Sequence, residues 1–312
     1  MEISYLRRKE IDIDKWNTCI ESNLETASVS AMSWYLDACC SDWGALIMGD
    51  YRTVIPLPLR KKFGIAYVYP PFFAPRLGVL GEKITASELD TALHFASKKF
   101  KWIDLIFSPD TDINTSNYQC FTHRVCTLDL QNSYDVLQKN YHKKHIYNCN
   151  RSQEGHLTFV QNANIEDVIS LFSRNMGENK QVGYRAKDYR ELKDLVVLLQ
   201  SKNAIEVVGV EDNEKKLCAG AFFTHRFGKY NFLFSGREQT KIQNRSMYFL
   251  LDNFILQHAQ SAVSLQINGS NNDQLAKFYA GFGTQEHQSH QITIEKLPIF
   301  LKKVLFIYRK LR

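Results

Sequence analysis

The sequence predicts an α/β protein with two tandem halves, each a mixed, mostly antiparallel sheet flanked by helices. The main observation is that one order of expected elements occurs twice: two helices, a hairpin, a strand, a helix and a strand. A second observation is that "LPLRKKFG", residues 57–64, is echoed by "FFTHRFG", residues 222–228. Third, an apolar strand follows an amphipathic helix at Ile103–Phe107 and again at Val263–Ile267. We therefore predict two similar αβ halves.

The first half, residues 1–132, is expected to contain a hairpin that turns at Gly49-Asp50, a pair typical of tight turns. Pro70-Pro71 ends the strand after this hairpin, because proline cannot donate to a sheet ladder. The expected elements are strand Ile3–Arg8, helices Asp14–Ser22 and Ser30–Cys40, hairpin strands Ala45–Met48 and Thr53–Leu59, strand Ile65–Tyr69, helix Ser87–Phe100, and strands Trp102–Phe107 and Arg124–Leu130.

A connecting helix, within residues 133–155 and expected from Ser133 to Asn150, leads into the second half, residues 156–296. There the polar turn "EDNEKK" marks a second hairpin. The expected elements are strand Leu157–Val160, helices Ile165–Met176 and Asp188–Leu199, hairpin strands Ile205–Val210 and Leu217–Thr224, strand Tyr230–Phe234, helix Met247–Gln260, strand Ala262–Ile267, helix Asp273–Tyr279 and strand Gln291–Glu295.

The composition is that of a globular protein with a mild positive charge. Of 312 residues, 44% are hydrophobic and 23% are charged, and the net charge is +6. This charge permits an anionic partner, such as a nucleotide cofactor, a phosphorylated precursor or RNA, without requiring one. No apolar run is long enough to span a bilayer, and the start "MEISYLRRKE" lacks the apolar core of a signal peptide. We therefore expect a cytoplasmic protein.

The seven cysteines are expected to be reduced thiols, because their number is odd and the adjacent Cys39 and Cys40 cannot easily form a structural disulfide. Cys120, His123 and Cys126 have a spacing that resembles a zinc site. However, an extended segment points alternate side chains to opposite faces, and no second pair completes four ligands. We therefore expect no metal.

Three stretches resemble parts of one protein superfamily. They are "LQKNYHKKHIYNCNRSQEG" for an inter-domain helix, "FSRNMGENKQVGYRAKDYREL" for a helix, basic loop and second helix, and "INGSNNDQLAKFYAGFG" for a strand, polar turn and short helix. Together with the order of elements, they resemble the GNAT superfamily of N-acyltransferases. Two such halves in one chain resemble the Fem-type (FemAB-like) aminoacyltransferases and related acetyltransferase-like proteins. The resemblance covers most of the chain, residues 1–295.

The resemblance implies a site for acetyl-CoA or another acyl-CoA in the second half. In GNAT proteins the fourth strand offers its backbone to the pantetheine arm, and the next helix N-terminus binds the pyrophosphate. The implied cofactor-binding residues are Phe232, Leu233, Phe234, Gln243, Asn244, Arg245 and Ser246. Taken alone, Ser246 can also be a simple helix cap. The corresponding loop of the first half is long and apolar, so at most one half is expected to bind the cofactor.

The resemblance also implies that Tyr279, in the last short helix, is the catalytic acid. Leu275 and Phe278 define the apolar face of that helix by their spacing, so Tyr279 is expected beside this face. The alternative is an aromatic residue of the core. No general base stands out; Asp252 and Glu206 are the carboxylates to consider.

The candidate substrate-binding residues lie in loops and in the connecting segment. Tyr141–His145 is the densest cationic patch, and in Fem-like proteins such a region lines the cleft between the halves. It implies an anionic acceptor or a tRNA acceptor stem, and the alternative is a solvated helix face. The candidates are Tyr69, Arg76, Tyr141, Lys144, Tyr184 and Arg185.

Residues 297–312 are expected to form a basic amphipathic helix, which can dock on the protein or contact the inner face of a membrane peripherally. From all these features we predict an N-acyltransferase that moves an acyl group from acyl-CoA to a small-molecule or peptide amine. One alternative is a Fem-like, aminoacyl-tRNA-dependent aminoacyltransferase acting on a cell-wall precursor. Another is a non-catalytic, ligand-binding GNAT-like module.

Overall fold

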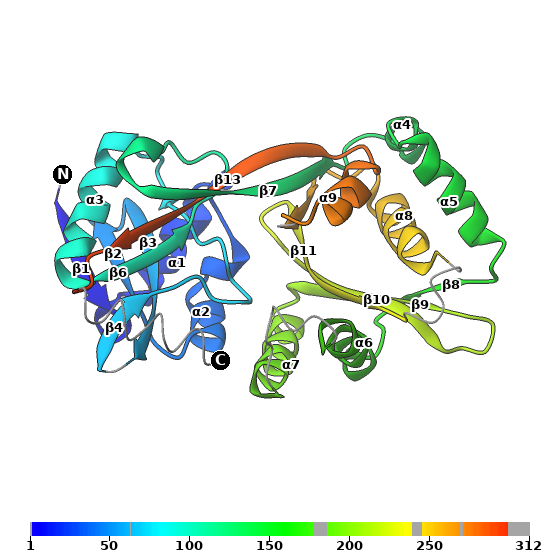
Figure 1. The fold of residues 1–312 in the computed structure, drawn as a ribbon, viewed down its shortest axis with the longest axis horizontal. Helices are drawn as coiled ribbons and strands as arrows, with labels where there is room; N and C mark the ends of the chain where they lie inside the picture. The colour runs from blue at the N-terminus through cyan, green and yellow to red at the C-terminus, as the bar shows by residue number, and fades with distance from the viewer. Residues whose placement is uncertain (1, 63, 178–185, 239–244, 269–270, 299–312) are drawn as a thin grey trace. The chain divides into compact units, whose positions relative to one another are not determined.

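The computed structural model describes residues 2–62, 64–177, 186–238, 245–268 and 271–298. The chain divides into two compact units (Figure 1). The first unit combines residues 1–122 with 289–312, and the second unit comprises residues 123–288. Each unit contains a mixed sheet flanked by helices, which confirms the predicted α/β fold class.

The sheet of the first unit has the strand order β1-β2-β3-β4-β6-β13. Neighbouring strands pair antiparallel, except for β4 and β6, which pair parallel at Val68 and Ile103. A two-residue strand, β5, adds to β3. The strands are β1 Ile3–Arg7, β2 Trp43–Met48, β3 Thr53–Lys62, β4 Ile65–Val68, β5 Leu80–Gly81, β6 Trp102–Ile106 and β13 Gln285–Glu295.

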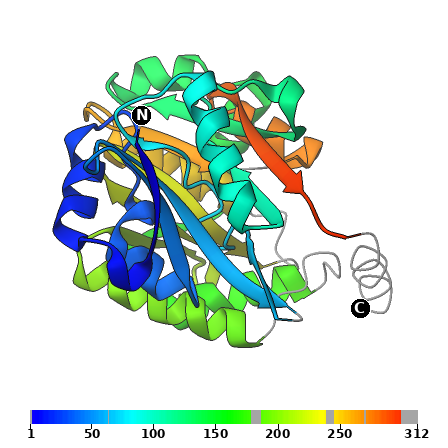
Figure 2. The ribbon, with the colours of Figure 1, turned by 90° about the vertical axis from the view of Figure 1, so that its left-hand side faces the viewer.

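Helices cover both faces of this sheet, with α3 on one face and α1 and α2 on the other (Figures 1 and 2). Helix α3 begins at a capping box, in which the Thr85 hydroxyl accepts from the Glu88 N–H and the Glu88 carboxylate accepts from the Thr85 N–H. The helical segments are η1 Arg8–Glu10, α1 Ile13–Ser22, η2 Val29–Ala31, α2 Ser33–Cys39, α3 Ala86–Lys99 and η3 Thr115–Asn117.

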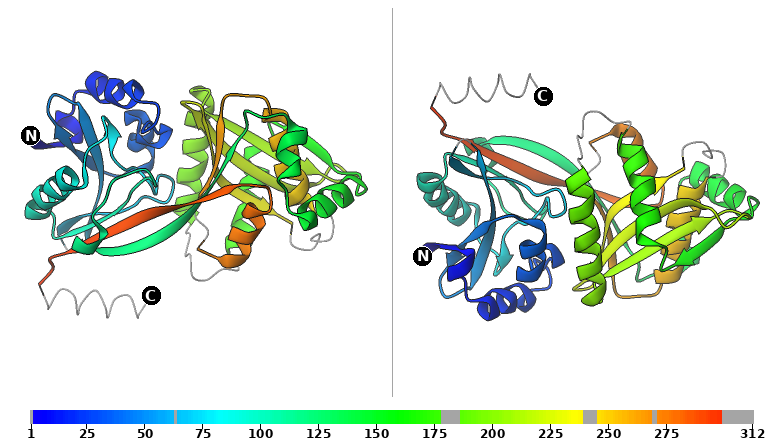
Figure 3. Two further views of the ribbon diagram at one scale, coloured as in Figure 1. Left: turned by 90° about the horizontal axis from the view of Figure 1, so that it is seen from above. Right: turned by 90° about the horizontal axis from the view of Figure 1, so that it is seen from below.

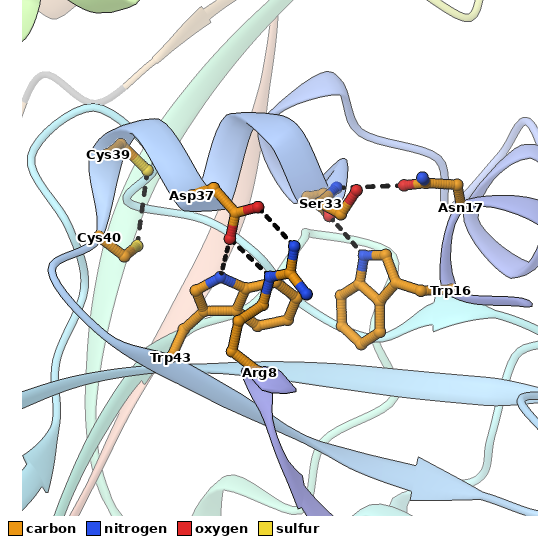
Figure 4. A network of polar contacts seen from close by, with 9 residues as sticks. Arg8, Trp16, Asn17, Ser33, Asp37, Cys39, Cys40 and Trp43 are labelled. Carbon is orange, nitrogen blue, oxygen red and sulfur yellow. Dashed lines mark hydrogen bonds and ion pairs between the residues drawn. The ribbon is translucent and has the colours of Figure 1, made fainter. Parts of the chain in front are cut away.

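A polar network fixes α2 against the sheet of the first unit (Figure 4). Arg8 donates two hydrogen bonds of 2.7 Å to the Asp37 carboxylate, and the Trp43 indole N–H donates to the same carboxylate at 2.9 Å. Burial alone would raise the pKa of Asp37, but these hydrogen bonds and the charge of Arg8 hold it below its ordinary value. The carboxylate thereby links α2 to both η1 and β2.

The second unit repeats this topology with the strand order β8-β9-β10-β11-β12-β7. Again one pair of neighbours, β11 and β12, is parallel, and the other pairs are antiparallel. The strands are β7 Gln119–Asp129, β8 Thr158–Gln161, β9 Ile205–Glu211, β10 Leu217–Arg226, β11 Lys229–Arg237 and β12 Ser264–Asn268.

The helices of the second unit form a layer on each side of its sheet (Figure 1). Helices α6 and α7 contact one side, and α8 and α9 lie on the other side together with α4 and α5. The central core is apolar and aromatic, with Phe223 stacked on Phe254 at a centroid distance of 3.7 Å. The helices are α4 Tyr134–Lys139, α5 Lys143–Gln153, α6 Ile165–Gly177, α7 Ala186–Ser201, α8 Ser246–His258 and α9 Asp273–Ala280.

The prediction of a single connecting helix from Ser133 to Asn150 is wrong, because this segment forms two helices, α4 and α5. At the break, the His142 N–H donates to the Gly281 carbonyl at 2.9 Å instead of continuing the helix. Gly283 is so close that a Cβ there would lie 2.8 Å from the Cβ of Asn140. Packing against the segment after α9 therefore interrupts the helix.

Each half gives its last strand to the sheet of the other half. Strand β7 follows the elements of the first half in sequence but pairs with β12, whereas β13 follows those of the second half and pairs with β6 (Figure 3). This exchange explains why the boundaries expected at residues 132, 155 and 296 differ from the compact units. Residues 123–155 belong to the second unit, and residues 289–296 belong to the first.

Residues Phe227 and Gly228, at the end of the echoed stretch "FFTHRFG", form the tight turn that joins β10 to β11. Both residues have a positive φ, 56° and 68°, as a two-residue type I′ turn requires. In the first unit, β3 and β4 are joined at residues 63–64, and Gly64 has a φ of 77°. Residue 63 lies outside the described residues.

Candidate functional site

The parallel strands β11 and β12 pair over only the first part of β11. The register joins Lys229 to Ser264 and ends with Phe232 opposite Ile267. Strand β11 continues to Arg237, beyond that last pair. Among the described residues, positions 233–237 therefore have no partner in β12. The C-terminal half of β11 presents a backbone edge where the two strands diverge.

A β-bulge lies at the point of divergence. In the pairing with β10, Phe223 is opposite Phe232 and Phe222 is opposite Phe234, so Leu233 has no opposing residue. The extra residue reverses the alternation of side chains. Phe232 therefore packs on Phe223, on the α8 side of the sheet, whereas Phe234 packs on α6 on the other side.

Asn175, on α6, shows which way the backbone of this edge points. Its side-chain amide donates to the Arg237 carbonyl at 2.8 Å and accepts from the Arg237 N–H at 2.7 Å. The next N–H, of Glu238, donates to β10 at 2.7 Å, so the polar groups of Arg237 point away from β10. Because alternate residues direct these groups to the same edge, Ser235 also faces away from β10. An extended ligand with amide groups can pair with such an edge.

Helix α8 begins beside the C-terminal end of β11. The Cys218 carbonyl of β10 accepts from the Glu238 N–H at 2.7 Å and from the hydroxyl of Ser246, the first residue of α8, at 3.5 Å. The N-terminal N–H groups of a helix, together with its dipole, favour an anion. The start of α8 therefore lies beside the C-terminal end of β11, the strand that carries the bulge.

Arg245 precedes this helix and adds a positive charge to it. Its backbone is left-handed, with a φ of 56°, and its Nε donates to Asn148 Oδ1 on α5 at 2.8 Å. Its guanidinium lies 5.9 Å from the ring centroid of Tyr147. The sequence interpretation missed Asn148, because a single asparagine in a polar helix gives no signal of such a contact. Arg245 is thus positioned by α5 at the start of α8.

Tyr279 lies on α9 with its ring against Phe232, where β11 and β12 diverge. The ring centroids are 5.9 Å apart. Tyr279 and Ala276 are buried, whereas Leu275 is 46% exposed. The expectation is therefore wrong for Leu275, which is exposed, and for Tyr279, which is buried, whereas Phe278 packs against the core of the second unit as expected. Tertiary packing turns Tyr279 toward β11 and leaves Leu275 in solvent.

The hydroxyl of Tyr279 is a neutral donor at physiological pH. Burial, with a smaller contribution from Cys126, raises its pKa to about 12. No hydrogen bond joins this hydroxyl to any of the described residues. It can therefore donate to a ligand without giving up another partner. Its catalytic role remains a prediction.

The two carboxylates considered as general bases have other partners. Asp252 is buried on α8, accepts from the Tyr134 hydroxyl at 2.8 Å, and has its pKa raised by burial. Glu206 accepts from the Tyr230 hydroxyl at 2.6 Å and pairs with His258 at 3.1 Å. Tyr230 lies near the start of β11, away from the C-terminal part of the strand that extends beyond its pairing with β12. These contacts direct neither carboxylate toward the open edge of β11.

In the first unit, the strands that correspond to β11 and β12 are β4 and β6. They pair at Val68 and Ile103, and Arg76 forms a parallel bridge with Ile106 further along β6. The segment after β4 therefore lies along the edge of β6 beyond that pair. The chain itself fills the region that corresponds to the open edge of the second unit.

Tyr69 and Arg76, both predicted to bind substrate, lie in this segment of the first unit. Tyr69 is buried, and the Arg60 guanidinium lies 4.1 Å from its ring centroid. Burial raises the pKa of Tyr69 to about 12 and lowers that of Arg76 to about 10. Within the described ranges, no side chain forms an ion pair with Arg76.

The remaining predicted substrate residues are not brought together. Tyr141 is buried in the core of the second unit against Phe282, whereas Lys144 is exposed on α5. Tyr184, Arg185, Gln243, Asn244 and residues 299–312 of the predicted tail lie outside the described residues.

The cysteine and histidine side chains of β7 do not converge. Cys120 Sγ lies 3.7 Å from His290 Nδ1, His123 contacts Asn271, and Cys126 is buried. Within the described part of the chain, no group of three His, Cys, Asp or Glu side chains is arranged to hold a metal ion. The seven cysteines all lie in the described ranges, and no disulfide bond joins any of them. Over the same residues, every helix is too short or too polar to cross a membrane.

Comparison with known proteins supports the fold. No protein-family model matches the sequence, and no curated protein matches it significantly. Among solved structures, FemX has a TM-score of 0.66 at 12% identity, covering 96% of this chain and 99% of its own. The C-terminal domain of a putative lysylphosphatidylglycerol synthetase from Agrobacterium fabrum has a TM-score of 0.54 at 12% identity, covering 94% of each chain.

A tandem GNAT protein from the clavulanic acid biosynthesis pathway is also similar. Its TM-score is 0.51 at 11% identity, and the match covers 95% of this chain and 99% of the other. The chain therefore has the Fem-like, tandem GNAT-type fold that the sequence predicted.

Proposed function

We propose that this chain, with its Fem-like tandem GNAT fold, is an N-acyltransferase whose second unit binds acyl-CoA and acylates an amine. The observation that carries the proposal is the bulge at Leu233, where β11 leaves β12, on a strand whose C-terminal end lies beside the start of α8. The similar structures support a transferase role. The choice of acyl-CoA as the acyl donor rests on the geometry of the second unit.

The residues of the site suit the chemistry of an acyl-CoA. The free edge of β11 near Ser235 would hold the amide-containing pantetheine arm by strand-like hydrogen bonds. The N-terminus of α8 and the charge of Arg245 would hold the pyrophosphate. Bound acyl-CoA supplies an activated acyl group as a thioester.

The residues of this chain then have distinct roles. The bulge leaves Leu233 without an opposing residue in β10. Its backbone N–H therefore stabilises the negative charge that develops on the acyl oxygen. The Tyr279 hydroxyl donates a proton to the departing thiolate. Water accepts the proton of the attacking amine, because Asp252 and Glu206 are hydrogen-bonded to tyrosine hydroxyls away from this site.

Thermal unfolding with coenzyme A tests the proposal. Coenzyme A at 100 times its Kd should stabilise the protein by about 2.7 kcal/mol. Arg245→Ala should weaken the affinity about tenfold, because it removes a charged donor to phosphate. Arg245→Lys should restore part of it. Arg190→Ala removes an exposed charge from α7 and should leave the affinity unchanged. No stabilisation by coenzyme A would contradict the proposal.

An aminoacyl-tRNA donor is the second candidate, favoured by the TM-score of 0.66 to FemX against 0.51 to the tandem GNAT protein. Exposed cations such as Lys144 on α5 would then bind RNA. RNA affinity should fall steeply with salt, and coenzyme A should have no effect. A protein that binds neither and transfers no acyl group would be a ligand-binding module on this fold.

A further inference from the structure

The end of helix α9, which carries Tyr279, is capped by a side chain from another helix. The carbonyls of Lys277, Tyr279 and Ala280 accept from backbone N–H groups that follow in the chain, at 3.2, 3.1 and 3.1 Å. The Phe278 carbonyl, which lies among them, accepts instead from Nε2 of His145 on α5 at 2.8 Å. Because a helix leaves its last four carbonyls without partners inside the helix, His145 completes the cap of α9.

The neighbours of His145 hold its ring in one position. The ring is buried and contacts three aromatic rings, those of Tyr248, Phe278 and Phe282, at centroid distances of 5.1, 5.8 and 4.9 Å. A Cβ at Gly281 would lie 1.9 Å from Cε1 of His145, so the backbone just after α9 approaches the ring as closely as only glycine allows. The ring therefore cannot shift without moving the end of α9.

The hydrogen bond to Phe278 decides which nitrogen of the neutral His145 ring carries the hydrogen. A carbonyl only accepts, so Nε2 carries the hydrogen and Nδ1 presents a lone pair. Nδ1 is buried, and no donor from the described residues reaches it. Protonation would turn it into a charged, buried N–H without an acceptor, which is costly. This position of the ring therefore suits the neutral imidazole.

The charged and titratable groups around His145 also oppose its protonation. Burial lowers the pKa of His145 below 6.5, and the charges of His142 and Lys144 on α5 lower it further, whereas the bond to the Phe278 carbonyl raises it. On α8, Tyr248 is neutral, because burial raises its pKa. The end of α9 and the turn after it present apolar rings. Within the described ranges, no carboxylate pairs with His145.

Helix α5 contacts both side chains to which acyl transfer is assigned. His145 holds the residue before Tyr279, and Asn148, three residues further along α5, accepts from Arg245 at the start of α8. All of these residues belong to the second unit.

We propose that His145 is the positioning residue for Tyr279 and acts only while it is neutral, so that acid displaces the end of α9 and stops acyl transfer. Once Nδ1 is protonated, the ring must leave its position to bring the new N–H to water, and the bond to the Phe278 carbonyl is lost with it. The effect on catalysis rests on the proposed function, because it acts through Tyr279. The cap of α9 and its loss in acid do not depend on that function.

NMR of the full chain with isotope-labelled histidine and tyrosine tests the proposal without an acyl donor. At neutral pH, His145 should show the tautomer with hydrogen on Nε2. As the pH falls from about 7.5 to about 5, the ring signals of Tyr279 should change with the same midpoint as the protonation of His145, below 6.5. Neither measurement needs a variant.

His145→Gln supplies an amide that can donate to the Phe278 carbonyl but cannot be protonated, so the Tyr279 signals should no longer respond to acid. His94→Gln, at an exposed histidine on α3, is the matched control and should leave the response unchanged. Urea unfolding gives a second measurement. Because the pKa of His145 is lowered in the folded protein, its contribution to stability is complete above 6.5 and is lost as the pH falls below that value, and His145→Gln should remove this loss.

Turnover of acetyl-CoA with an amine gives the catalytic readout. Over the same pH range, kcat of the unchanged protein should fall at least about tenfold further than kcat of His145→Gln, while coenzyme A affinity stays alike. Absence of any turnover would count against the proposed function, and the Tyr279 signals would still decide the role of His145. Hydrogen on Nδ1 at neutral pH, Tyr279 signals that ignore acid, or an equal acid response in His145→Gln would overturn the proposal.

Discussion

At Leu233, one extra residue decides the geometry of the candidate site. Strict alternation would place Phe232 and Phe234 on the same face of the sheet, but the bulge separates them. The sequence predicted that these three residues form part of the site. It did not predict the bulge, because a bulge depends on the pairing of β11 with β10 and is not indicated by the residue types.

Tyr279→Phe tests the proposed acid. We expect the rate of acyl transfer to fall by about 10² to 10⁴, the usual range for general acid catalysis. Unfolding stability should hardly change, because the hydroxyl has no partner among the described residues. Coenzyme A affinity measured on the same variant serves as the control. A variant with normal turnover would exclude this role.

The pairing of Glu206 with His258 predicts a pH-dependent stability. Burial would lower the pKa of His258, but the hydrogen bonds to Glu206 and to the Phe254 carbonyl, with the Glu206 charge, raise it above 6.5. Its contribution is therefore complete below pH 6.5 and is lost as the pH rises through the raised value. Burial raises the pKa of Glu206, but its bonds to His258 and Tyr230 lower it below 4.5 overall, so its contribution is lost at acid pH.

A double-mutant cycle with Glu206→Gln and His258→Gln, followed by urea unfolding, measures this coupling. We expect about 1 kcal/mol or less at pH 6, since the pair is partly exposed, and less at pH 8. A coupling energy that is equal at the two pH values would show that the imidazole is not charged in the folded protein.

At the scale of elements, most helices and strands were predictable, because each follows from local apolar periodicity and turn residues. The hairpins, and the helices that became α3, α6 and α8, are examples. The break between α4 and α5 was not predictable, because it depends on contact with Gly281 and Gly283, far away in sequence. The exposed Leu275 on α9 has a similar cause, since tertiary packing, and not the spacing of apolar residues, decides that Ala276 and Tyr279 are the buried residues of this helix.

The close packing of α6 on β11 gives a prediction about Gly236. A Cβ at this position would overlap the backbone nitrogen of Phe172 and lie 2.5 Å from the carbonyl carbon of Leu171. Gly236→Ala should therefore cost about 2–4 kcal/mol in unfolding free energy and reduce coenzyme A affinity by moving β11. Gly155→Ala is the matched control, because its Cβ would meet no atom closer than 3.3 Å. We expect a change within about 0.5 kcal/mol there. Equal effects of the two substitutions would contradict this packing.

At the scale of the whole molecule, the two halves of similar topology were predictable from the repeated order of elements, but the strand exchange was not. Strand β13 lies far from β6 in sequence, and its alternating residues do not indicate which strand it pairs with. The exchange means that the first unit is not complete without residues 289–295.

Truncation tests this dependence. A chain that ends at residue 288 loses the part of β13 that pairs with β6, including the fully buried Ile292. We expect the first unit to unfold or to be cleaved rapidly in limited proteolysis, while residues 123–288 remain protected. A chain that ends at residue 298 keeps β13 and is the control. Equal protection of residues 1–122 in both chains would refute the exchange.

The proposed acyl-CoA site consists of the part of β11 that extends beyond its pairing with β12 and the start of α8. Mapping backbone amide shifts by NMR during a coenzyme A titration tests it most directly. We expect the largest shifts at Leu233, Ser235, Ser246 and Met247, and small shifts at Tyr69 and Arg76 in the first unit. Shifts concentrated around Tyr69 and Arg76, or no saturable shifts in β11 and α8, would contradict it.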